Sequence, residues 1–265
     1  MCLLIVLSQM YEAWPLVIAA NRDEWLARPT TPITVLSECD PRILGGRDEV
    51  AGGTWLATNE HGVVAGLTNR PPGPAGRQVL RSRGELPMFL AQHASAAAAA
   101  EAFADAFRPA DFNPCWLLAG DRDSLHYIDM SGVTDEDRAT ARALSPGLHI
   151  LENRELDAVS PKSRHVRRLL DGVERETGEG LVAFLSNVLR NHEIPEGAEH
   201  GAPREDGFVR PAATEAACVH AGPYGTRSSS IVLVPSDRAA RPVVHIAEGR
   251  PCETPLRDVT KMWEG

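Results

Sequence analysis

The chain has 265 residues, of which 43% are hydrophobic and 24% are charged, proportions that are usual for a soluble globular protein. Its formal net charge of −9 disfavours a nucleic-acid partner, because phosphates require a basic face, and it also disfavours docking on anionic lipid. No apolar run is as long as a membrane span and the first residues do not look like a signal peptide, so we expect a cytoplasmic protein without integral membrane association.

The first part of the sequence predicts two β-hairpins. Cys2–Leu7 and Leu16–Ala20 are short apolar runs with a polar connection between them. Thr54–Thr58 and Val63–Leu67 form a second pair, and the residues that join them include the Asn and Gly that tight turns require. The proline-rich stretch Arg28–Ile43 lies between the hairpins and predicts a surface loop.

The rest of the chain alternates pairs of helices with pairs of strands. Helical patterns cover Ser82–His93, Ala94–Phe107 with Ser95 as its N-cap, Ser160–Glu176 with proline at its first position, and Gly180–Arg190. Strand patterns cover Trp116–Ala119, Leu125–Met130, Leu148–Leu151, Ser229–Pro235 and Val243–Glu248. Residues 195–214 are rich in glycine, proline and charge, which predicts a mobile excursion between the last helix and the last strand pair.

This order of elements predicts one α+β domain over residues 1–265. No linker separates two complete sets of elements, and the length is near the upper limit for one hydrophobic core. Each strand pair and each helix pair has an apolar face that must be buried. Two antiparallel sheets packed face to face, with the helix pairs outside, satisfy that requirement.

The cysteines and histidines show no metal-binding pattern along the sequence. The five cysteines are an odd number and none belongs to a Cys-x-x-Cys pair, so neither a zinc site nor a dithiol redox motif is indicated. The nine histidines have no ligand spacing, and several alternate with apolar residues or lie in predicted turns, among them His61, His126, His149, His220 and His245. We therefore predict reduced thiols, no metal and no cofactor.

Cys2 is the first candidate for catalysis, because it directly follows the initiator methionine. Cysteine is small enough for that methionine to be removed, which would leave a thiol and a free α-amine on one residue. A thiolate attacks carbonyl groups, and an N-terminal amine with a reference pKa of about 7.7–8.0 exchanges protons near neutrality. The alternative is that cysteine stands at position 2 by chance, and the rest of the chain decides between the two.

A series of short motifs, in order along nearly the whole chain, favours the catalytic hypothesis. They are Met1-Cys2, Asn21-Arg22-Asp23-Glu24, Arg28-Pro29-Thr30, Gly52-Gly53-Thr54-Trp55, Gly66-Leu67-Thr68-Asn69-Arg70, Glu152-Asn153 and Tyr224-Gly225-Thr226-Arg227-Ser228-Ser229-Ser230. Together they resemble the NRDE family, also called the Transport and Golgi organisation 2 family. That family is similar to the cysteine branch of the N-terminal-nucleophile hydrolases, which includes penicillin V acylase, bile-salt hydrolase and acid ceramidase. The resemblance implies a four-layer αββα sandwich and cleavage of non-peptide amide bonds by the terminal cysteine.

The same resemblance nominates two asparagines as partners of Cys2. Asn69, at the end of the predicted strand Val63–Leu67, matches the position of an oxyanion-hole asparagine in the acylases; its alternative role is to cap a turn. Asn153 matches an asparagine that contacts substrate or the terminal amine, and its alternative is a turn at the entry of a helix.

Arg22 and Asp23 complete the predicted catalytic set on electrostatic grounds. A carboxylate close to the terminal amine would hold it in one orientation, and an arginine near the sulfur would lower the thiol pKa. Alternatively, the two residues pair with each other and brace a strand end. The acylases usually carry arginine at the start of this motif, where this chain has Asn21, and in a strand a shift by one residue changes the face of a side chain.

Four further residues are predicted to bind substrate. Asn21 and Glu24 occupy the two ends of the motif, where the acylases have an arginine and an acidic residue. Trp55 is predicted to form the pocket wall, with the core as its alternative. Arg227 would neutralise a substrate carboxylate or the oxyanion region, or else form a structural salt bridge.

Three functional hypotheses follow from the sequence. The first is an N-terminal cysteine hydrolase that cleaves an amide or thioester of a small acylated substrate. The second, suggested by discussion of eukaryotic family members in haem and lipid handling, is a non-catalytic carrier of haem or an acyl-lipid cargo on the same scaffold. The third is an inert structural domain. The expected partner is accordingly a small acylated molecule or a hydrophobic cargo.

Overall fold

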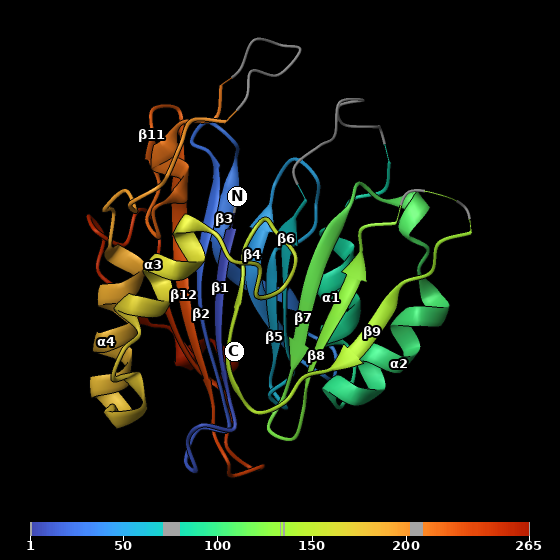
Figure 1. Cartoon of the computed structure of the whole chain (residues 1–265). Coiled ribbons are helices and arrows are strands. Elements are labelled where there is room, and N and C mark those ends of the chain that lie inside the picture. The colour runs from blue at the N-terminus through green and yellow to red at the C-terminus, as the bar shows by residue number, and fades with distance from the viewer. Residues whose placement is uncertain (1, 71–79, 133, 135, 202–208, 265) are drawn as a thin grey trace.

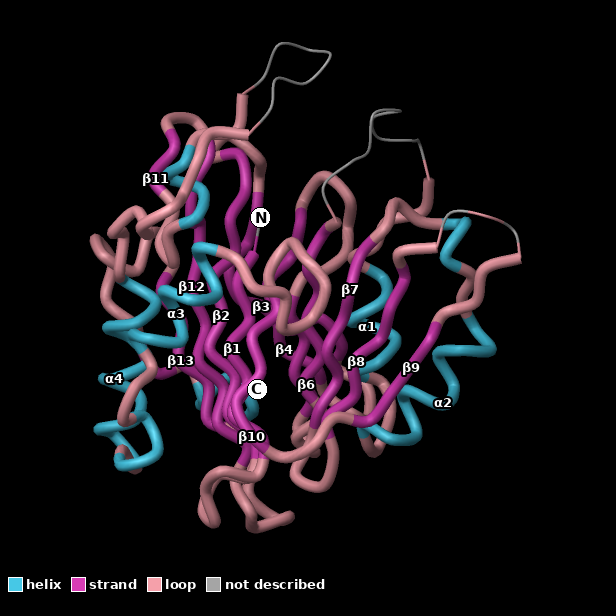
Figure 2. The backbone as a smooth tube through the Cα atoms, in the orientation of Figure 1, coloured by secondary structure: helices cyan, strands magenta, loops and turns pink. Residues whose placement is uncertain are grey.

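Two antiparallel β-sheets lie face to face between two layers of helices in a computed structural model of the chain (Figure 1; Figure 2). The structure describes residues 2–70, 80–132, 134, 136–201 and 209–264. The four layers are those of an αββα sandwich, so the fold class predicted from the order of elements is confirmed. No helix among these residues is long and apolar enough to cross a membrane.

The first sheet contains the first and the last strand of the described residues. Its order is β10-β1-β2-β12-β13-β14, and β11 pairs with β12. The strands are β1 (Cys2–Ser8), β2 (Leu16–Trp25), β10 (Gly147–Leu151), β11 (His220–Ala221), β12 (Tyr224–Val234), β13 (Val243–Ala247) and β14 (Arg257–Asp258). The order brings the N-terminal hairpin between strands that are more than 100 residues away in sequence, because β1 pairs with β10 and β2 pairs with β12.

The second sheet is a meander in sequence order, from β3 to β9. Its strands are β3 (Thr30–Ser37), β4 (Ile43–Asp48), β5 (Leu56–Asn59), β6 (Val64–Asn69), β7 (Cys115–Gly120), β8 (Leu125–Met130) and β9 (Thr140–Ala143). Consecutive strands along it are antiparallel neighbours. Strands β6 and β7 are joined by the long segment that contains α1 (Glu85–Ala91) and α2 (Ala96–Ala106), and the other connections are shorter.

Strand β1 shows why the central strands are apolar along their whole length. Leu4 and Val6 point into the core between the two sheets, whereas Leu3, Ile5 and Leu7 point into the core between the first sheet and its helices. Successive side chains of a strand face opposite sides, so a strand covered on both sides needs apolar residues at every position.

The helices cover the outer face of each sheet. Figure 1 shows α3 (Pro161–Leu169) and α4 (Gly178–Arg190) outside the first sheet, and α1 (Glu85–Ala91) and α2 (Ala96–Ala106) outside the second. As predicted, the hydroxyl of Ser95 caps α2 by accepting a hydrogen bond from the Ala98 amide. Within the described part of the chain, four short 3₁₀ helices complete the elements: Pro109–Asp111, Val173–Arg175, Ala212–Glu215 and Thr260–Glu264.

Several predicted boundaries were wrong. The proline-rich stretch predicted as a loop contains β3, an edge strand that accommodates Pro32 through register irregularities in its pairing with β4. The helix predicted to reach Glu176 ends at Leu169, because Gly172 adopts a positive φ of 88° and starts a 3₁₀ turn. Strand β4 and the short strands β9, β11 and β14 were missed.

The most consequential difference is the length of β2. Its predicted end was Ala20, but the strand continues through Asn21-Arg22-Asp23-Glu24 to Trp25. Pairing on both sides explains the extension, since Cys2 lies opposite Arg22 on one side and Tyr224 lies opposite Trp25 on the other. The polar motif is therefore extended, and its side chains alternate between the two faces of the sheet.

The segment predicted as a mobile excursion, residues 195–214, is only partly described. Residues 202–208 lie outside the described residues. On either side the backbone is hydrogen bonded, with the Gly201 amide donating to the Arg210 carbonyl at 2.8 Å. Directly after the segment, the buried carboxylate of Glu215 forms ion pairs with Arg210 at 2.9 Å and Arg154 at 3.0 Å. These contacts fix the C-terminal end of the excursion to the body of the protein.

Candidate active site

Cys2 lies at the edge of a cavity of about 300 Å³ between the two sheets. It begins β1 and is directly opposite Arg22 on β2. Directly opposite residues of antiparallel strands place their side chains on the same face. The thiol and the guanidinium group therefore share the face that is turned toward the second sheet.

The cavity is lined by residues from both sheets and from the segment before α1. Charged and polar side chains dominate the lining, and arginines outnumber acidic residues in it. The lining residues are Cys2, Arg22, Asp23, Glu24, Arg28, Asp48, Ala51, Gly53, Thr54, Trp55, Leu67, Asn69, Leu80, Arg81, Ser82, Arg83, Gly84 and Asn113.

A close backbone contact closes one side of this cavity. The Thr54 amide donates a hydrogen bond to the Gly84 carbonyl at 3.0 Å. A β-carbon on Gly53 would come within 2.5 Å of the Gly84 backbone, so the two segments would have to move apart. Glycine at position 53 thus lets the segment that carries Arg81 and Arg83 approach the second sheet.

Asn153 joins Cys2 to the second sheet. Its Oδ1 accepts a hydrogen bond of 2.7 Å from the backbone nitrogen of Cys2, and its Nδ2 donates to the backbone carbonyl of Asn69. Asn153 follows β10 and is buried, whereas Asn69 ends β6 and lines the cavity. One amide side chain therefore fixes the nitrogen of Cys2 relative to the end of β6.

Arg22 is held at the cavity by three partners. Its guanidinium carbon lies 4.2 Å from the centre of the Trp55 ring, and its Nη2 lies 3.5 Å from Asp48 and 3.8 Å from Glu24. Its Nη1 is buried and has no hydrogen-bond partner among the described residues. Burial lowers the pKa of Arg22, but an arginine remains protonated at physiological pH. The site thus holds a charged donor that lacks an acceptor.

Asp23 faces the helix layer and meets a fully buried lysine. Lys162 Nζ on α3 lies 3.7 Å from Asp23 Oδ2, and both side chains have no exposed surface. The hydroxyl of Thr226 donates to Asp23 Oδ1 at 2.6 Å. Burial raises the pKa of the Asp23 carboxyl above its ordinary value, and the positive charge of Lys162 opposes that rise. A buried ion pair therefore lies directly behind the strand that carries the motif.

The thiol of Cys2 is also affected by its surroundings. Burial raises its pKa above the ordinary value, and the charge of Asp23 acts in the same direction. The Arg22 charge acts in the opposite direction and favours the thiolate. The net effect is a thiol that is protonated at neutral pH unless a base next to it accepts the proton.

The structure brings together most of the residues predicted from the sequence. Cys2, Arg22, Asp23, Asn69, Glu24 and Trp55 all border the cavity, and Asn153 contacts both Cys2 and Asn69. The displacement of arginine by one position relative to the acylases does not remove it from the site, because Arg22 is on the face of Cys2.

Asn21 and Arg227, both predicted to bind substrate, are placed away from the cavity lining. Asn21 faces the helices, where its amide donates to the carbonyls of Leu189 at 2.9 Å and Ala217 at 2.8 Å. Arg227 lies in an irregularity of the β2–β12 pairing and donates to the Leu26 carbonyl. The Asn21 amide is therefore occupied by backbone carbonyls, and Nη1 of Arg227 is bound to one.

Sequence analysis missed Lys162, although the sequence contains a signal for it. The chain has 27 basic residues, and only Lys162 and Lys261 among them are lysines. Lys162 stands in the first turn of α3, where a positive charge is unfavourable because the helix dipole is positive at that end. A rare lysine at an unfavourable position indicates a specific partner. Arg81 and Arg83 were missed because they line the cavity only through the contact between Gly53 and Gly84.

Two antiparallel sheets between helix layers are also the architecture of several solved structures. The Caenorhabditis elegans orthologue of N-acylethanolamine-hydrolyzing acid amidase shares the fold with a TM-score of 0.54 and 13% identity, over 90% of this chain and 95% of the amidase. Penicillin V acylase from Agrobacterium tumefaciens gives a TM-score of 0.55 and 12% identity, over 98% of this chain and 87% of the acylase. At these identities the likeness concerns the fold.

The family is shown by sequence. The family model described as Transport and Golgi organisation 2 matches residues 1–246. The "Transport and Golgi organization protein 2 homolog" of Bos taurus is 32% identical over 238 residues, which are 85% of this chain and 84% of the bovine protein. The chain belongs to the Transport and Golgi organisation 2 family, and the resemblance inferred from its motifs is confirmed.

The buried ion pair predicts the effect of replacing its lysine. Lys162→Met leaves the Asp23 carboxylate buried without the opposite charge of Lys162, so we expect the free energy of unfolding to fall by about 3–5 kcal/mol. Adding Asp23→Asn in the same chain removes the buried negative charge and should recover much of that loss. Urea denaturation followed by tryptophan fluorescence measures both variants. The control is Lys261→Met, which replaces the exposed lysine; an equal effect of the two single substitutions would contradict the prediction.

The environment of Cys2 predicts a pH dependence of its alkylation. Because burial raises the thiol pKa, the rate of reaction with iodoacetamide should still rise above pH about 8.5, the ordinary thiol value. Arg22→Leu removes a charge that favours the thiolate, so the midpoint should move to higher pH, whereas Arg22→Lys should stay closer to wild type. Peptide mass spectrometry measures the rate at Cys2, with the exposed Cys39 of the same chain as internal reference. A midpoint that Arg22→Leu leaves unchanged refutes the argument.

Proposed function

We propose that this protein is an N-terminal cysteine hydrolase that cleaves an amide or thioester bond of a small acylated substrate. In this proposal removal of Met1 makes Cys2 the first residue, so that its backbone nitrogen becomes the catalytic α-amine. The observation that carries the proposal is the placement of Cys2 in the cavity, opposite Arg22, with its nitrogen bound to Asn153 Oδ1 at 2.7 Å. The fold shared with N-terminal-nucleophile hydrolases supports it.

The reaction would proceed through a covalent acyl-enzyme. The α-amine of Cys2 takes the thiol proton while the sulfur attacks the acyl carbonyl, which forms a carbon–sulfur bond and a tetrahedral oxyanion. Collapse of this intermediate breaks the bond to the leaving amine or thiol, which receives the proton from the α-amine. Water then attacks the thioester, releases the carboxylic acid and regenerates the thiol.

Because burial raises the thiol pKa, the adjacent amine has a necessary role in this scheme. A thiol that is protonated at neutral pH attacks poorly, and a base on the same residue removes the proton when the substrate arrives. Asn153 would hold that amine through the hydrogen bond that it makes to the Cys2 nitrogen. Asp23, whose negative charge lies behind the strand, would favour the protonated amine in the intermediate.

Two residues could stabilise the oxyanion. Arg22 Nη1 is a buried donor without a partner among the described residues, and such a donor lowers the free energy of any complex that supplies an acceptor. Asn69 lines the cavity at the end of β6 and provides a second, neutral donor. Trp55 and Asp48 fix Arg22 before substrate binds, which is what electrostatic stabilisation of a transition state requires.

The carrier hypothesis finds less support in the cavity. Haem iron is usually held by His, Cys, Met or Tyr, and Cys2 is the only one of these residue types among the described residues that line the cavity. A volume of about 300 Å³ is at the small end for ligand pockets, and its charged lining suits a polar group better than a flat apolar macrocycle. Binding of a ligand without its hydrolysis would nevertheless favour the carrier hypothesis over the hydrolase.

The proposal predicts that hydrolysis depends on Cys2. Purified protein should lack the mass of Met1, and a panel of N-acyl amides and acyl thioesters of different chain lengths should yield an acyl adduct on Cys2 by mass spectrometry. Cys2→Ser should lower kcat by more than roughly 10⁴-fold, because the nucleophile is lost, while leaving substrate binding in place. Cys39→Ser, at an exposed cysteine, is the matched control. A retained Met1, or turnover that survives Cys2→Ser, would overturn the proposal.

Asn69 gives a second, independent prediction. Asn69→Ala removes one candidate oxyanion donor, and we expect kcat to fall by roughly 10²–10³-fold with a small change in KM. The backbone carbonyl of Asn69 remains available to Asn153, so the position of the Cys2 nitrogen should be preserved. Steady-state kinetics on the best substrate of the panel measures the effect. A rise in KM at constant kcat would assign Asn69 to substrate binding and exclude the oxyanion role.

A further inference from the structure

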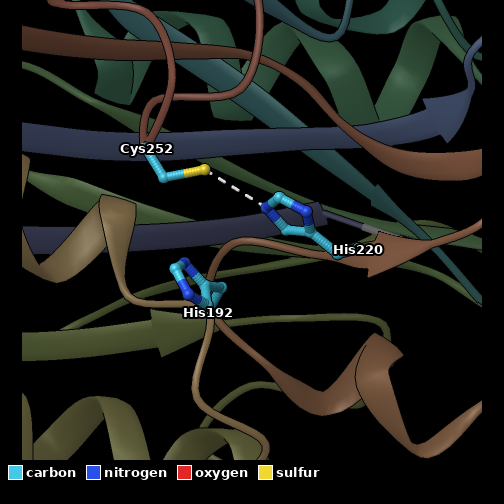
Figure 3. A group of neighbouring side chains, drawn as sticks. All are labelled: His192, His220 and Cys252. Atoms are coloured by element: carbon cyan, nitrogen blue, oxygen red, sulfur yellow. Dashed lines mark hydrogen bonds between the residues drawn. The ribbon is translucent and has the colours of Figure 1, made fainter.

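A second cluster of reactive side chains lies outside the cavity, at the end of the first sheet. His192, His220 and Cys252 each offer a donor atom, and these atoms all lie within 4.8 Å of one another (Figure 3). Cys218 is a fourth member, with its sulfur 3.7 Å from His220 Nε2 and 3.7 Å from the Cys252 sulfur. The remaining contact joins His220 Nε2 to the Cys252 sulfur at 3.2 Å. None of the four residues lines the cavity that contains Cys2.

The distances fit the edges of a tetrahedral metal site. With metal–sulfur bonds of about 2.3 Å and metal–nitrogen bonds of about 2.0–2.1 Å, a tetrahedron has S···S edges of about 3.8 Å and S···N edges of about 3.5 Å. The three contacts among Cys218, His220 and Cys252 match these edges within about 0.3 Å. The rings of His192 and His220 have their centres 5.3 Å apart and their planes tilted by 56°. The donor atom of His192 lies within 4.8 Å of those of His220 and Cys252, and a movement of the exposed His192 side chain toward Cys218 would complete the fourth vertex.

The fold holds the four donors from three separate segments. His192 directly follows α4, Cys218 and His220 flank the start of β11, and Cys252 lies in a turn after β13. The Cys218 amide donates to the Asn191 carbonyl at 2.8 Å, which fixes the first two segments to each other. Cys218 is buried while His192 is exposed, so the group has a closed inner side and an open outer side. Such an arrangement gives a metal a route of entry.

We propose that Cys218, His220, Cys252 and His192 bind one Zn²⁺ ion. Two sulfur and two imidazole donors in tetrahedral arrangement are typical of structural zinc sites, in which all coordination positions come from the protein. Binding replaces the two thiol protons with metal–sulfur bonds and releases them to solvent. The expectation from the sequence that the chain contains no metal site rested on the absence of Cys-x-x-Cys pairs and of a ligand spacing among the histidines. In this proposal the ligands are spread over 61 positions, from 192 to 252.

The metal would stabilise the sheet end next to the active site. Val219, between two of the ligands, donates its amide to the Thr226 hydroxyl at 2.8 Å, and that hydroxyl donates to Asp23 Oδ1 at 2.6 Å. The ion would also link His192, which precedes residues 195–214, to the three other ligands, which follow that segment. We therefore expect the metal to act through stability and not through contact with substrate.

Titration with Co²⁺, a spectroscopic substitute for Zn²⁺, tests the proposal. Untagged, reduced, metal-free protein with the Cys2→Ser substitution is used, because a terminal cysteine would itself chelate the ion. We expect one equivalent to bind, with the visible absorption of tetrahedral cobalt and the near-ultraviolet bands of cobalt–thiolate bonds. Cys252→Ser and His220→Gln should each weaken binding by at least about 10-fold. Zn²⁺ should raise the Tm of the parent protein and leave that of Cys252→Ser unchanged.

The control variants are Cys39→Ser and His245→Gln, which replace residues of the same types outside the cluster and should bind as the parent does. Circular dichroism establishes that Cys252→Ser folds. The proposal is overturned if Co²⁺ shows only the weak spectrum of octahedral coordination, or if binding is unaffected by both ligand substitutions. It is also overturned if protein alkylated at cell lysis contains a Cys218–Cys252 disulfide, since that bond would remove both thiolates.

Discussion

The antiparallel register between β1 and β2 determines what the cavity between the sheets contains. Because Cys2 is paired with Arg22, the sulfur and the guanidinium group share one face, and Asp23 is turned toward the helices and Lys162. A shift of the β1–β2 register by one residue would exchange the faces of Arg22 and Asp23, and it would bring the Asp23 carboxylate to the Cys2 sulfur. The register is fixed by apolar side chains along both faces of β1, which cannot be moved by one position without exchanging the two cores.

Charged groups lie on both faces of the paired strands β1 and β2. Arg22, which shares the face of the thiol, lies between aromatic and acidic neighbours, whereas the ion pair of Asp23 and Lys162 is completely removed from solvent. A buried ion pair contributes little net stability compared with apolar residues of the same size. Its presence behind residues 21–24 therefore indicates that the site requires a defined electrostatic field. The proposed amine of Cys2 is the group on which that field would act.

The sequence predicted the layers of the fold and most residues around Cys2, but it could not predict groups that only long-range pairing assembles. Periodicity identified β1, β6 and the capped helix α2, because each depends on local pattern. The polar end of β2 looked like a loop, since its strand character comes from pairing with Cys2 on one side and Tyr224 on the other. Lys162 and the cluster around His220 depend on segments that are distant in sequence, and no spacing rule reveals them.

The double role of Asn153 limits which side chain this position accepts. Its oxygen receives the hydrogen of the Cys2 nitrogen, and its own nitrogen donates to the Asn69 carbonyl. Only an amide combines both functions at that length, and aspartate, although identical in shape, would set a carboxylate against the carbonyl. A carboxylate at this one position would therefore break the side-chain link between the Cys2 nitrogen and the end of β6, so the geometry at Cys2 depends on a single amide group.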